Sequence, residues 1–368
     1  MGSLEEIHMP QNGINYSGVM ALASAIRHNP ELRVLNLNDN TFTKKGSLPM
    51  AQALRHLRNI QVINFGDCLV RSEGAVALAA VLREGLPILK ELNLSFGEIT
   101  EAAALVVAQA VADKADMEKL DLNGNCLGEE GCEALREAME NMNKGDVLES
   151  LSDDEGDEGD EDDSGNDDDD DDDEDDVSDD CSEENEEGSE IAKENGITTN
   201  GNSPVSPNSP AEITSFLSCP SAERLLQLGQ LRTHLQQEVD ASEPQKAADV
   251  ILKIGSLYSE DPETKAAVLD TIDAMLKKLL SGSTLQSYCF LSTLLVMMGL
   301  LKGEGKTKKA LLVPGQLLCL EHAVQQEYFP KHDASLLHIF LSRNGGVLKS
   351  CGSARERLSS ALERRCQD

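Results

Sequence analysis

One short motif in this chain has the residue types and spacing for covalent chemistry: Leu301, Lys302, Gly303 and Glu304. An apolar residue, a lysine, any residue and an acidic residue, in this order, form the acceptor pattern for SUMO conjugation. Such a segment must be extended. It then places its leucine in an apolar groove, presents the lysine amine to a thioester and pairs its glutamate with basic residues of the conjugating enzyme. We therefore identify Lys302 as a candidate acceptor flanked by Leu301 and Glu304.

Motifs of four residues also occur by chance, and the alternative is that Lys302 is an unmodified surface lysine. Its surroundings favour the acceptor role, because the motif ends an apolar run and is followed by a basic stretch at 306–309. We expect Gly303 to end the preceding helix, since glycine commonly terminates helices, and to let the chain extend.

Three serines, each followed by proline, form a second group with possible chemistry: Ser203, Ser206 and Ser209. Serine before proline in a flexible segment suits proline-directed phosphorylation, which would add negative charge there. Serine-proline pairs are also common in disordered chain without any such role. These three residues are candidate phosphosites.

Residue patterns for an enzyme active site are absent from the sequence. There is no phosphate-binding loop, no H-E-x-x-H, no nucleophile elbow and no metal-ligand cluster, and the seven histidines are dispersed. The nine cysteines include no C-x-x-C pair and no signal peptide precedes them, which indicates a reducing compartment. We expect neither a cofactor nor a metal, and a protein that is not itself an enzyme.

Residues 1–145 contain a pattern that returns every 28 or 29 residues and has the form L-x-x-L-x-L-x-x-N/C-x-L, the leucine-rich repeat. Each L-x-L segment predicts a short strand, and stretches such as 17–29 and 72–84 have helical periodicity. We predict an α/β solenoid of the ribonuclease-inhibitor type, with a parallel sheet inside and helices outside. Gly97 replaces the usual Asn or Cys, so the fourth turn should be the weakest. The five copies begin at Leu4, Leu32, Ile60, Leu89 and Met117.

The concave face of this solenoid is predicted to be polar and rich in asparagine. Its residues come from the middle of each strand and from the positions just after it. Small polar residues could simply solvate an exposed strand, but a whole column of them favours a protein ligand bound by hydrogen bonds and a few charges. The candidate contact residues are Asn36, Asn38, Asp39, Asn64, Asp67, Asn93 and Asp121.

Most of the net charge of −34 lies in one tract. Residues 146–190 contain 28 Asp and Glu and no Lys or Arg. A tract with so few apolar residues cannot bury enough surface to fold, so we predict a disordered linker over 146–210. It is either a solvated spacer or a means to attract a basic partner, which can raise association rates ~10- to 1000-fold. Nucleic-acid binding is not expected, because phosphate recognition needs a basic surface.

From residue 211 to 368 the composition is that of a folded domain with helical periodicity, and we predict an all-α C-terminal domain. The run 285–301 is almost continuously apolar. It is too short and too interrupted by Ser and Thr to cross a bilayer, so membrane insertion is not expected. We predict that it forms the buried centre of this domain.

These residues together resemble the vertebrate Ran GTPase-activating protein family. The similarity covers both folded regions and is carried by four runs: 36–42 (NLNDNTF), 64–71 (NFGDCLVR), 294–304 (LLVMMGLLKGE) and 324–331 (VQQEYFPK). The resemblance implies a regulatory protein that stimulates GTP hydrolysis by Ran in its GTP form. In this family catalysis uses no arginine finger; it positions Ran's own glutamine and the attacking water.

The resemblance also implies SUMO conjugation within a Leu-Lys-Ser-Glu motif. This modification holds the family's vertebrate members at the cytoplasmic side of the nuclear pore, on a SUMO-binding nucleoporin. Lys302 corresponds to the acceptor, and Gly303 replaces the serine, which adds flexibility. The implied partners are Ran, SUMO and the SUMO-conjugating enzyme. The implied locations are the cytoplasm and the nuclear envelope, with the nucleus and the mitotic kinetochore and spindle as further sites.

The repeat array departs from the family at its start. It begins at Leu4, without the polar cap that a solenoid normally has, and the family's arrays are about twice as long. The asparagine that orients Ran's glutamine belongs to earlier repeats. We therefore expect Ran contacts from this chain but little or no activation, and an N-terminally short version of the protein.

Two other functions remain open. One is an acidic leucine-rich-repeat protein that binds basic partners such as histones; the 28-residue period and the helical domain count against it. The other is an anchor, in which the C-terminal domain with Lys302 acts alone as a SUMO-dependent adaptor at the pore.

Overall fold

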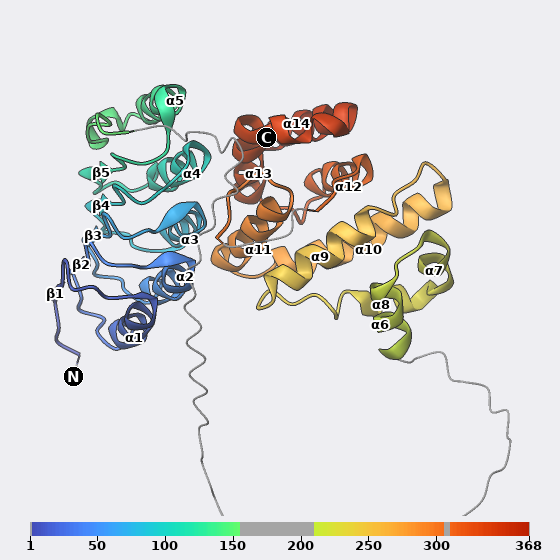
Figure 1. Ribbon diagram of the computed structural model, residues 1–368, viewed down its shortest axis with the longest axis horizontal. Helices are drawn as coiled ribbons and strands as arrows, with labels where there is room; N and C mark the ends of the chain where they lie inside the picture. Colours follow the sequence, from blue (N-terminus) through green and yellow to red (C-terminus); the bar gives the residue numbers. More distant parts are fainter. Residues whose placement is uncertain (1, 155–209, 305–309, 368) are drawn as a thin grey trace, which may run out of the picture. The chain divides into compact units, whose positions relative to one another are not determined.

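The computed structural model describes residues 2–154, 210–304 and 310–367. In the first range each repeat contributes one short strand to a parallel sheet, and the strands follow one another in sequence order. The predicted parallel sheet of the α/β solenoid is confirmed (Figure 1). The strands are β1 (Glu6–His8), β2 (Val34–Asn36), β3 (Val62–Asn64), β4 (Glu91–Asn93) and β5 (Lys119–Asp121).

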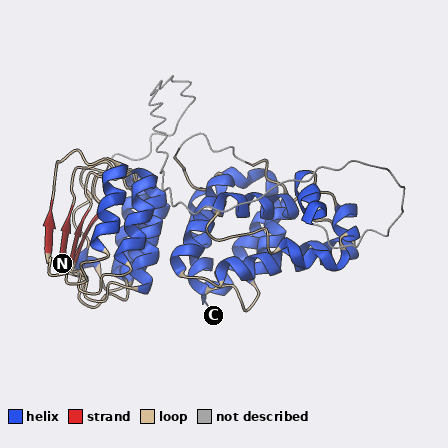
Figure 2. Cartoon of the chain, turned by 90° about the horizontal axis from the view of Figure 1, so that it is seen from below, coloured by secondary structure: helices blue, strands red, loops and turns tan. Residues whose placement is uncertain are grey.

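A helix follows each strand, so the repeats form a layer of strands and a layer of helices (Figure 2). The residues at the centre of each strand are in register with one another and buried, because the period of two turns every second side chain toward the helices. The predicted helical stretches 17–29 and 72–84 correspond to the first and third of these helices. The five are α1 (Tyr16–Ile26), α2 (Thr43–Leu54), α3 (Arg71–Glu84), α4 (Glu101–Val111) and α5 (Gly128–Asn141).

In the turn after each strand, the first residue in the left-handed region occupies the same position of the repeat. Asp39 and Asp67, at φ 55° and 52°, occupy this position in the second and third repeats. Aspartate tolerates this conformation better than most residues. In the fifth repeat the residue is Gly124, where a side chain would also collide with the Phe96 ring, because an added Cβ would lie 2.2 Å from it. The residues at this position of the five repeats are Gln11, Asp39, Asp67, Phe96 and Gly124.

Buried asparagines join neighbouring repeats. Asn125 donates to the carbonyls of Leu94 and Leu122 and accepts from the amides of Gly97 and Ile99, at 2.8–3.1 Å. The backbone of the Gly97 turn, which lacks a side chain of its own, is thus bonded by the next repeat.

The chain keeps the repeat spacing for some residues after α5. Residues 145–154 form part of a sixth turn: Leu148 bridges to Leu120, and Asp154 accepts the amides of Asn125, Leu127 and Gly128. Residues 146–154, the described start of the range 146–210 that we assign to the acidic linker, thus pack on the fifth repeat. Its larger part, 155–209, lies outside the described residues.

The C-terminal region is helical in its described residues, as predicted. One of its helices, residues 284–297, packs on α3 of the repeats as well as on helices of its own region. Of the helices that the structure describes, none is long and apolar enough to span a bilayer. Besides short 3-10 turns, they are α6 (Pro210–Ser218), α7 (Ala222–Gln227), α8 (Arg232–Leu235), α9 (Pro244–Gly255), α10 (Pro262–Leu280), α11 (Thr284–Met297), α12 (Pro314–Val324), α13 (Lys331–Asn344) and α14 (Gly352–Gln367).

The apolar run 285–301 forms the buried α11, but this helix ends at Met297. The expectation that Gly303 ends it is wrong. The terminating residue is Gly299, whose φ is 74°, and the amide of Leu300 then bonds back to the carbonyl of Leu295 at 2.9 Å. A left-handed glycine with this bond is a common helix end. The acceptor motif therefore begins after a tight turn rather than on the helix itself.

The described repeats and C-terminal helices belong to one compact unit. Helix α11 packs on α3, and α13 packs on α4. The predicted boundaries at 145 and 211 remain predictions, but the chain on either side of them shares one buried cluster.

Candidate functional site

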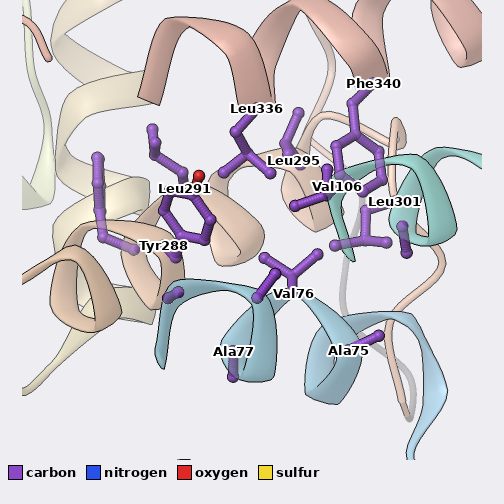
Figure 3. Packing of buried hydrophobic residues seen from close by; sticks show 14 of the residues in the cluster. Ala75, Val76, Ala77, Val106, Tyr288, Leu291, Leu295, Leu301, Leu336 and Phe340 are labelled. Atoms are coloured by element: carbon purple, nitrogen blue, oxygen red, sulfur yellow. The ribbon is translucent and has the colours of Figure 1, made fainter. Parts of the chain in front are cut away.

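The acceptor motif lies where the C-terminal helices meet the repeats. Leu301 is 3% exposed and belongs to the same buried cluster as Val76 of α3, Val106 of α4 and Phe340 of α13 (Figure 3). The Lys302 side chain is exposed. The carbonyl of Leu300, just before the motif, accepts a 2.9 Å hydrogen bond from Asn344.

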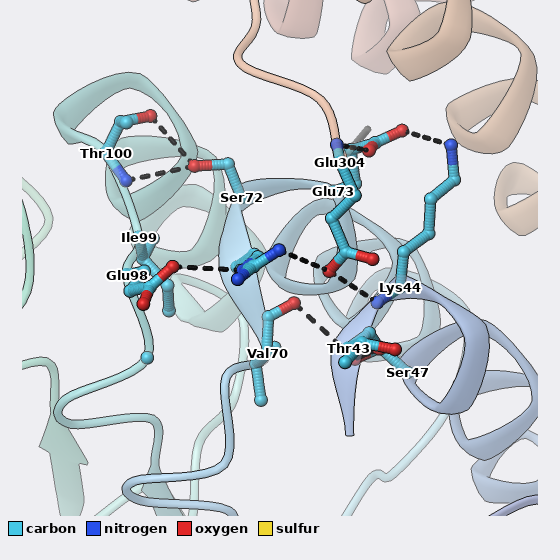
Figure 4. Close-up of polar contacts among 12 residues, drawn as sticks. Thr43, Lys44, Ser47, Val70, Ser72, Glu73, Glu98, Ile99, Thr100 and Glu304 are labelled. Atoms are coloured by element: carbon cyan, nitrogen blue, oxygen red, sulfur yellow. Dashed lines mark hydrogen bonds and ion pairs between the residues drawn. The ribbon is translucent and has the colours of Figure 1, made fainter. Parts of the chain in front are cut away.

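Glu304 lies in a polar socket formed by the repeats, which we define as Lys44, Arg71 and Glu73 (Figure 4). Its carboxylate accepts the backbone amide of Lys44 at 2.7 Å and lies 3.4 Å from the Arg71 guanidinium. Its own amide donates to the Glu73 carboxylate at 3.3 Å. Because Lys44 is in the first turn of α2, the carboxylate also benefits from the positive end of the helix dipole.

The socket is held by charges of the repeats themselves. Glu73 is 5% exposed and pairs with the Lys44 ammonium at 2.6 Å. Arg71 also pairs with Glu98 at 3.0 Å. A buried carboxylate needs such partners, because an unpaired charge is costly to bury. The negative charges of Glu73 and Glu304 are thus shared among two basic side chains.

Beside the motif is a cavity of about 450 Å³ between the acceptor segment and the repeats. In the described ranges 2–154, 210–304 and 310–367, no three of His, Cys, Asp and Glu are gathered as a metal ion would require. The residues that line the cavity include Arg71, Ser72, Glu98, Thr100, Cys126 and Lys302.

Further polar contacts hold the C-terminal helices against the repeats. Arg343 of α13 pairs with Glu101 of α4 at 2.8 Å, and Ser335 donates to Gln109 at 2.6 Å. Burial raises the pKa of the Glu101 carboxyl, and the Arg343 charge opposes this shift. The contact therefore consists of an apolar centre with polar pairs around it.

A buried carboxyl lies close to this contact. Asp333 of α13 has no solvent exposure and accepts the Ser287 hydroxyl at 2.9 Å. Burial raises its pKa to about 7, against the hydrogen bond from Ser287 and the charge of Arg83 in α3. Burial and Arg83 also lower the pKa of the neighbouring His332. Of these two groups, Asp333 is therefore the one expected to exchange a proton near neutral pH.

The predicted concave column has a structural role of its own. Four of its members accept the amide two residues later: Asn36 from Asn38, Asn64 from Gly66, Asn93 from Ser95 and Asp121 from Asn123, at 2.9–3.1 Å. Each side chain therefore stabilises the turn that follows its own strand.

Asn38, Asp39 and Asp67 are the other three members of the column. Asn38 donates to the carbonyl of Gly66 at 2.6 Å. Asn93 and Asp121, from the first four, also bond to each other at 3.2 Å. Asp39 is half-buried and Asp67 exposed, and both take the left-handed backbone of the turn. The two aspartates are therefore the best candidates for contact with a ligand.

The candidate phosphosites Ser203, Ser206 and Ser209 lie outside the described residues.

The sequence analysis does not predict the socket or the contact of which it is part. A signal was present, because α3 and α4 are apolar on all sides: residues 74–82 of α3 are all buried. A helix of that kind is covered on every face, whereas the outer helix of a solenoid should have a polar side.

Comparison with known proteins shows where the chain has relatives. Residues 183–363 match the RanGAP1 C-terminal domain, and residues 28–51 and 115–135 match the Leucine Rich repeat. The chain is 53% identical to Ran GTPase-activating protein 1 of Xenopus laevis over 97% of its own length and 63% of that relative. It is 50% identical to the Ran GTPase-activating protein of Drosophila melanogaster over 42% of its length and 26% of that relative. The chain thus spans less than two thirds of the length of either.

Proposed function

This chain is a relative of the Ran GTPase-activating proteins along nearly its whole length, and we propose that it acts on Ran in the GTP form as a regulatory protein. The observation that carries this proposal is the 53% identity with the Xenopus relative, which extends over both folded regions. Hydrolysis would be carried out by Ran, and the concave face of the repeats would supply contacts to it.

The role of the concave face is tested by removing charges from it while keeping its backbone conformation. Asparagine accepts the left-handed conformation, so Asp39→Asn with Asp67→Asn should leave the turns intact. We expect binding of GTP-loaded Ran to weaken about tenfold, because two charges facing the partner are lost. Glu137→Gln, at an exposed position of α5, is the matched control and should bind as the unaltered chain does. Equal affinity of all three proteins would remove the concave face from the proposal.

Activation is a separate part of the proposal. The resemblance assigns the positioning of Ran's glutamine to repeats that precede those present here, so we expect little acceleration of single-turnover GTP hydrolysis by the purified chain. Strong acceleration would show that the five repeats suffice. Salt-sensitive binding of histones without binding of Ran would instead favour an acidic binding protein.

We further propose that Lys302 is a SUMO acceptor through which the protein is anchored at the nuclear pore. The motif and the exposure of the lysine support this role. Purified conjugating enzymes should modify the chain, Lys302→Arg should abolish the modification, and Lys253→Arg, at another exposed lysine, should not. In cells, a tagged chain should be found in the cytoplasm and at the nuclear envelope, and Lys302→Arg should lose the envelope fraction. Modification of Lys302→Arg at the normal rate would remove the claim for this lysine.

A further inference from the structure

We propose that the repeats hold the acceptor segment 301–304 in a closed form that a conjugating enzyme cannot use, so that conjugation at Lys302 requires the C-terminal helices to separate from α3 and α4. The inference rests on the proposed SUMO acceptor and adds its regulation. It follows from what the structure does with the two flanking residues rather than with the lysine.

An acceptor segment is recognised through its flanks as well as its lysine. In this structure both flanking residues, Leu301 and Glu304, already make contacts inside the molecule. Leu301 is 3% exposed within the shared apolar cluster, and the Glu304 side chain is 18% exposed and bound in the socket. The Lys302 side chain is exposed, yet the groups that would orient it on an enzyme face the repeats.

The socket resembles in its chemistry what an enzyme would offer. It presents a guanidinium, an ammonium nearby and a helix N-terminus to the Glu304 carboxylate. The closed segment therefore satisfies this charge as a basic enzyme surface would, and the two compete for one carboxylate. Because an enzyme binds only the open form, its apparent affinity is reduced by the fraction of molecules that are open.

Glycine at position 303 permits this arrangement. A Cβ added there would lie 2.7 Å from a methyl group of Val296, on the buried side of α11. Its φ is not in the left-handed region, so another residue is excluded by space rather than by backbone conformation. A side chain at 303 would push the segment out of its closed position while leaving the acceptor pattern intact.

The first test reverses one charge pair at the edge of the contact, away from the motif. Glu101→Arg and Arg343→Glu each replace the 2.8 Å pair with repulsion, whereas the double variant restores attraction with the charges exchanged. We expect each single variant to be conjugated at least about threefold faster than the unaltered chain under limiting enzyme, and the double variant to return close to its rate. Glu133→Arg, at an exposed position of α5, is the control for added charge and should have no effect.

The second test uses Gly303→Ala, which should also speed conjugation. Hydrogen exchange at the amide of Glu304, which donates to Glu73, should become faster in every variant that speeds conjugation. Circular dichroism at equal protein concentration confirms that the variants remain folded.

The outcomes separate this inference from the proposed acceptor. If Lys302→Arg abolishes conjugation but all the interface variants react at the rate of the unaltered chain, the closed form is refuted and the acceptor stands. If no variant is conjugated, open or closed, the acceptor itself is refuted. A double variant as fast as the single ones would also refute the closed form, because the pair would then not be what holds it.

Discussion

At the scale of single residues, a proton on Asp333 links stability to pH. Its folded-state pKa of about 7 lies above its ordinary value of 3.8, so between these values the folded protein binds a proton that the unfolded chain does not. The free energy of unfolding should therefore fall as pH rises through this window, by at most about 1.4 kcal/mol per pH unit.

Asp333→Asn should remove this part of the pH dependence, since the amide stays neutral and can still accept from Ser287. Urea unfolding at pH 5, 6, 7 and 8 gives the free energy of unfolding of both proteins. As pH rises, this free energy should increase for the variant relative to the unaltered chain. Asp270→Asn, at an exposed position of α10, is the control. Parallel stability curves for the Asp333 variant and the unaltered chain would contradict the prediction.

A second prediction at this scale concerns Asn125. Its side chain is 3% exposed and bonds four backbone groups in two repeats. Asn125→Ala leaves these buried groups without partners and should lower the free energy of unfolding by about 3 kcal/mol. Asn141→Ala, at the exposed end of α5, where φ is not positive, serves as a comparison for loss of an asparagine that does not join buried backbone groups. A loss below about 1 kcal/mol for Asn125→Ala would show that water or a backbone shift replaces the bonds.

At the scale of elements, the end of α11 decides where the acceptor segment begins. Gly299 has φ 74°, and alanine there would be strained, so Gly299→Ala should cost about 1 kcal/mol or more. Gly346→Ala is the matched control, because its φ is not positive and an added Cβ meets nothing within 4 Å. Denaturant unfolding of the two variants checks the difference. Similar stability of both would mean that the turn after α11 tolerates a side chain.

The elements also show what a sequence can predict. The strands of the repeats follow from local spacing, because a fixed period determines where each leucine lies. The predicted end of α11 at Gly303 is wrong, because both Gly299 and Gly303 are plausible terminators and only the packing of the turn distinguishes them. Asn36 and Asn64 stabilise the turns that follow their strands, and asparagines at the same positions would also suit a ligand surface. Residue type alone therefore cannot distinguish a structural role from a binding role.

The contact between the repeats and the C-terminal helices could not be predicted in the same way. It joins residues more than 200 positions apart, such as Gln109 and Ser335, and no local pattern pairs them. The sequence does show that α3 and α4 are apolar on every side. This indicates that another part of the chain covers these helices, but not which part.

At the scale of the whole molecule, the packing of α11 and α13 on α3 and α4 should make these two repeat helices the most stable part of the array. A solenoid usually gains stability only from neighbouring repeats. Here α3 and α4 are covered on both faces, whereas α1 buries only Val19, Ala23 and Ile26. Hydrogen exchange should therefore be slowest in α3 and α4 and faster in α1. Glu101→Arg should reduce the protection of α4 more than that of α1, and equal protection of α1 and α4 in the unaltered chain would contradict this view.

The bonds of Asn125 also determine an order of assembly during synthesis. The ribosome releases the repeats from the N-terminal end, and the amide of Gly97 and the carbonyl of Leu94 find their partner only in the following repeat. We expect a nascent chain whose exposed part ends before Asn125 to keep its fourth turn open and sensitive to protease. Protection of that turn in arrested chains should begin only once residue 125 has left the exit tunnel, so each repeat would wait for its successor.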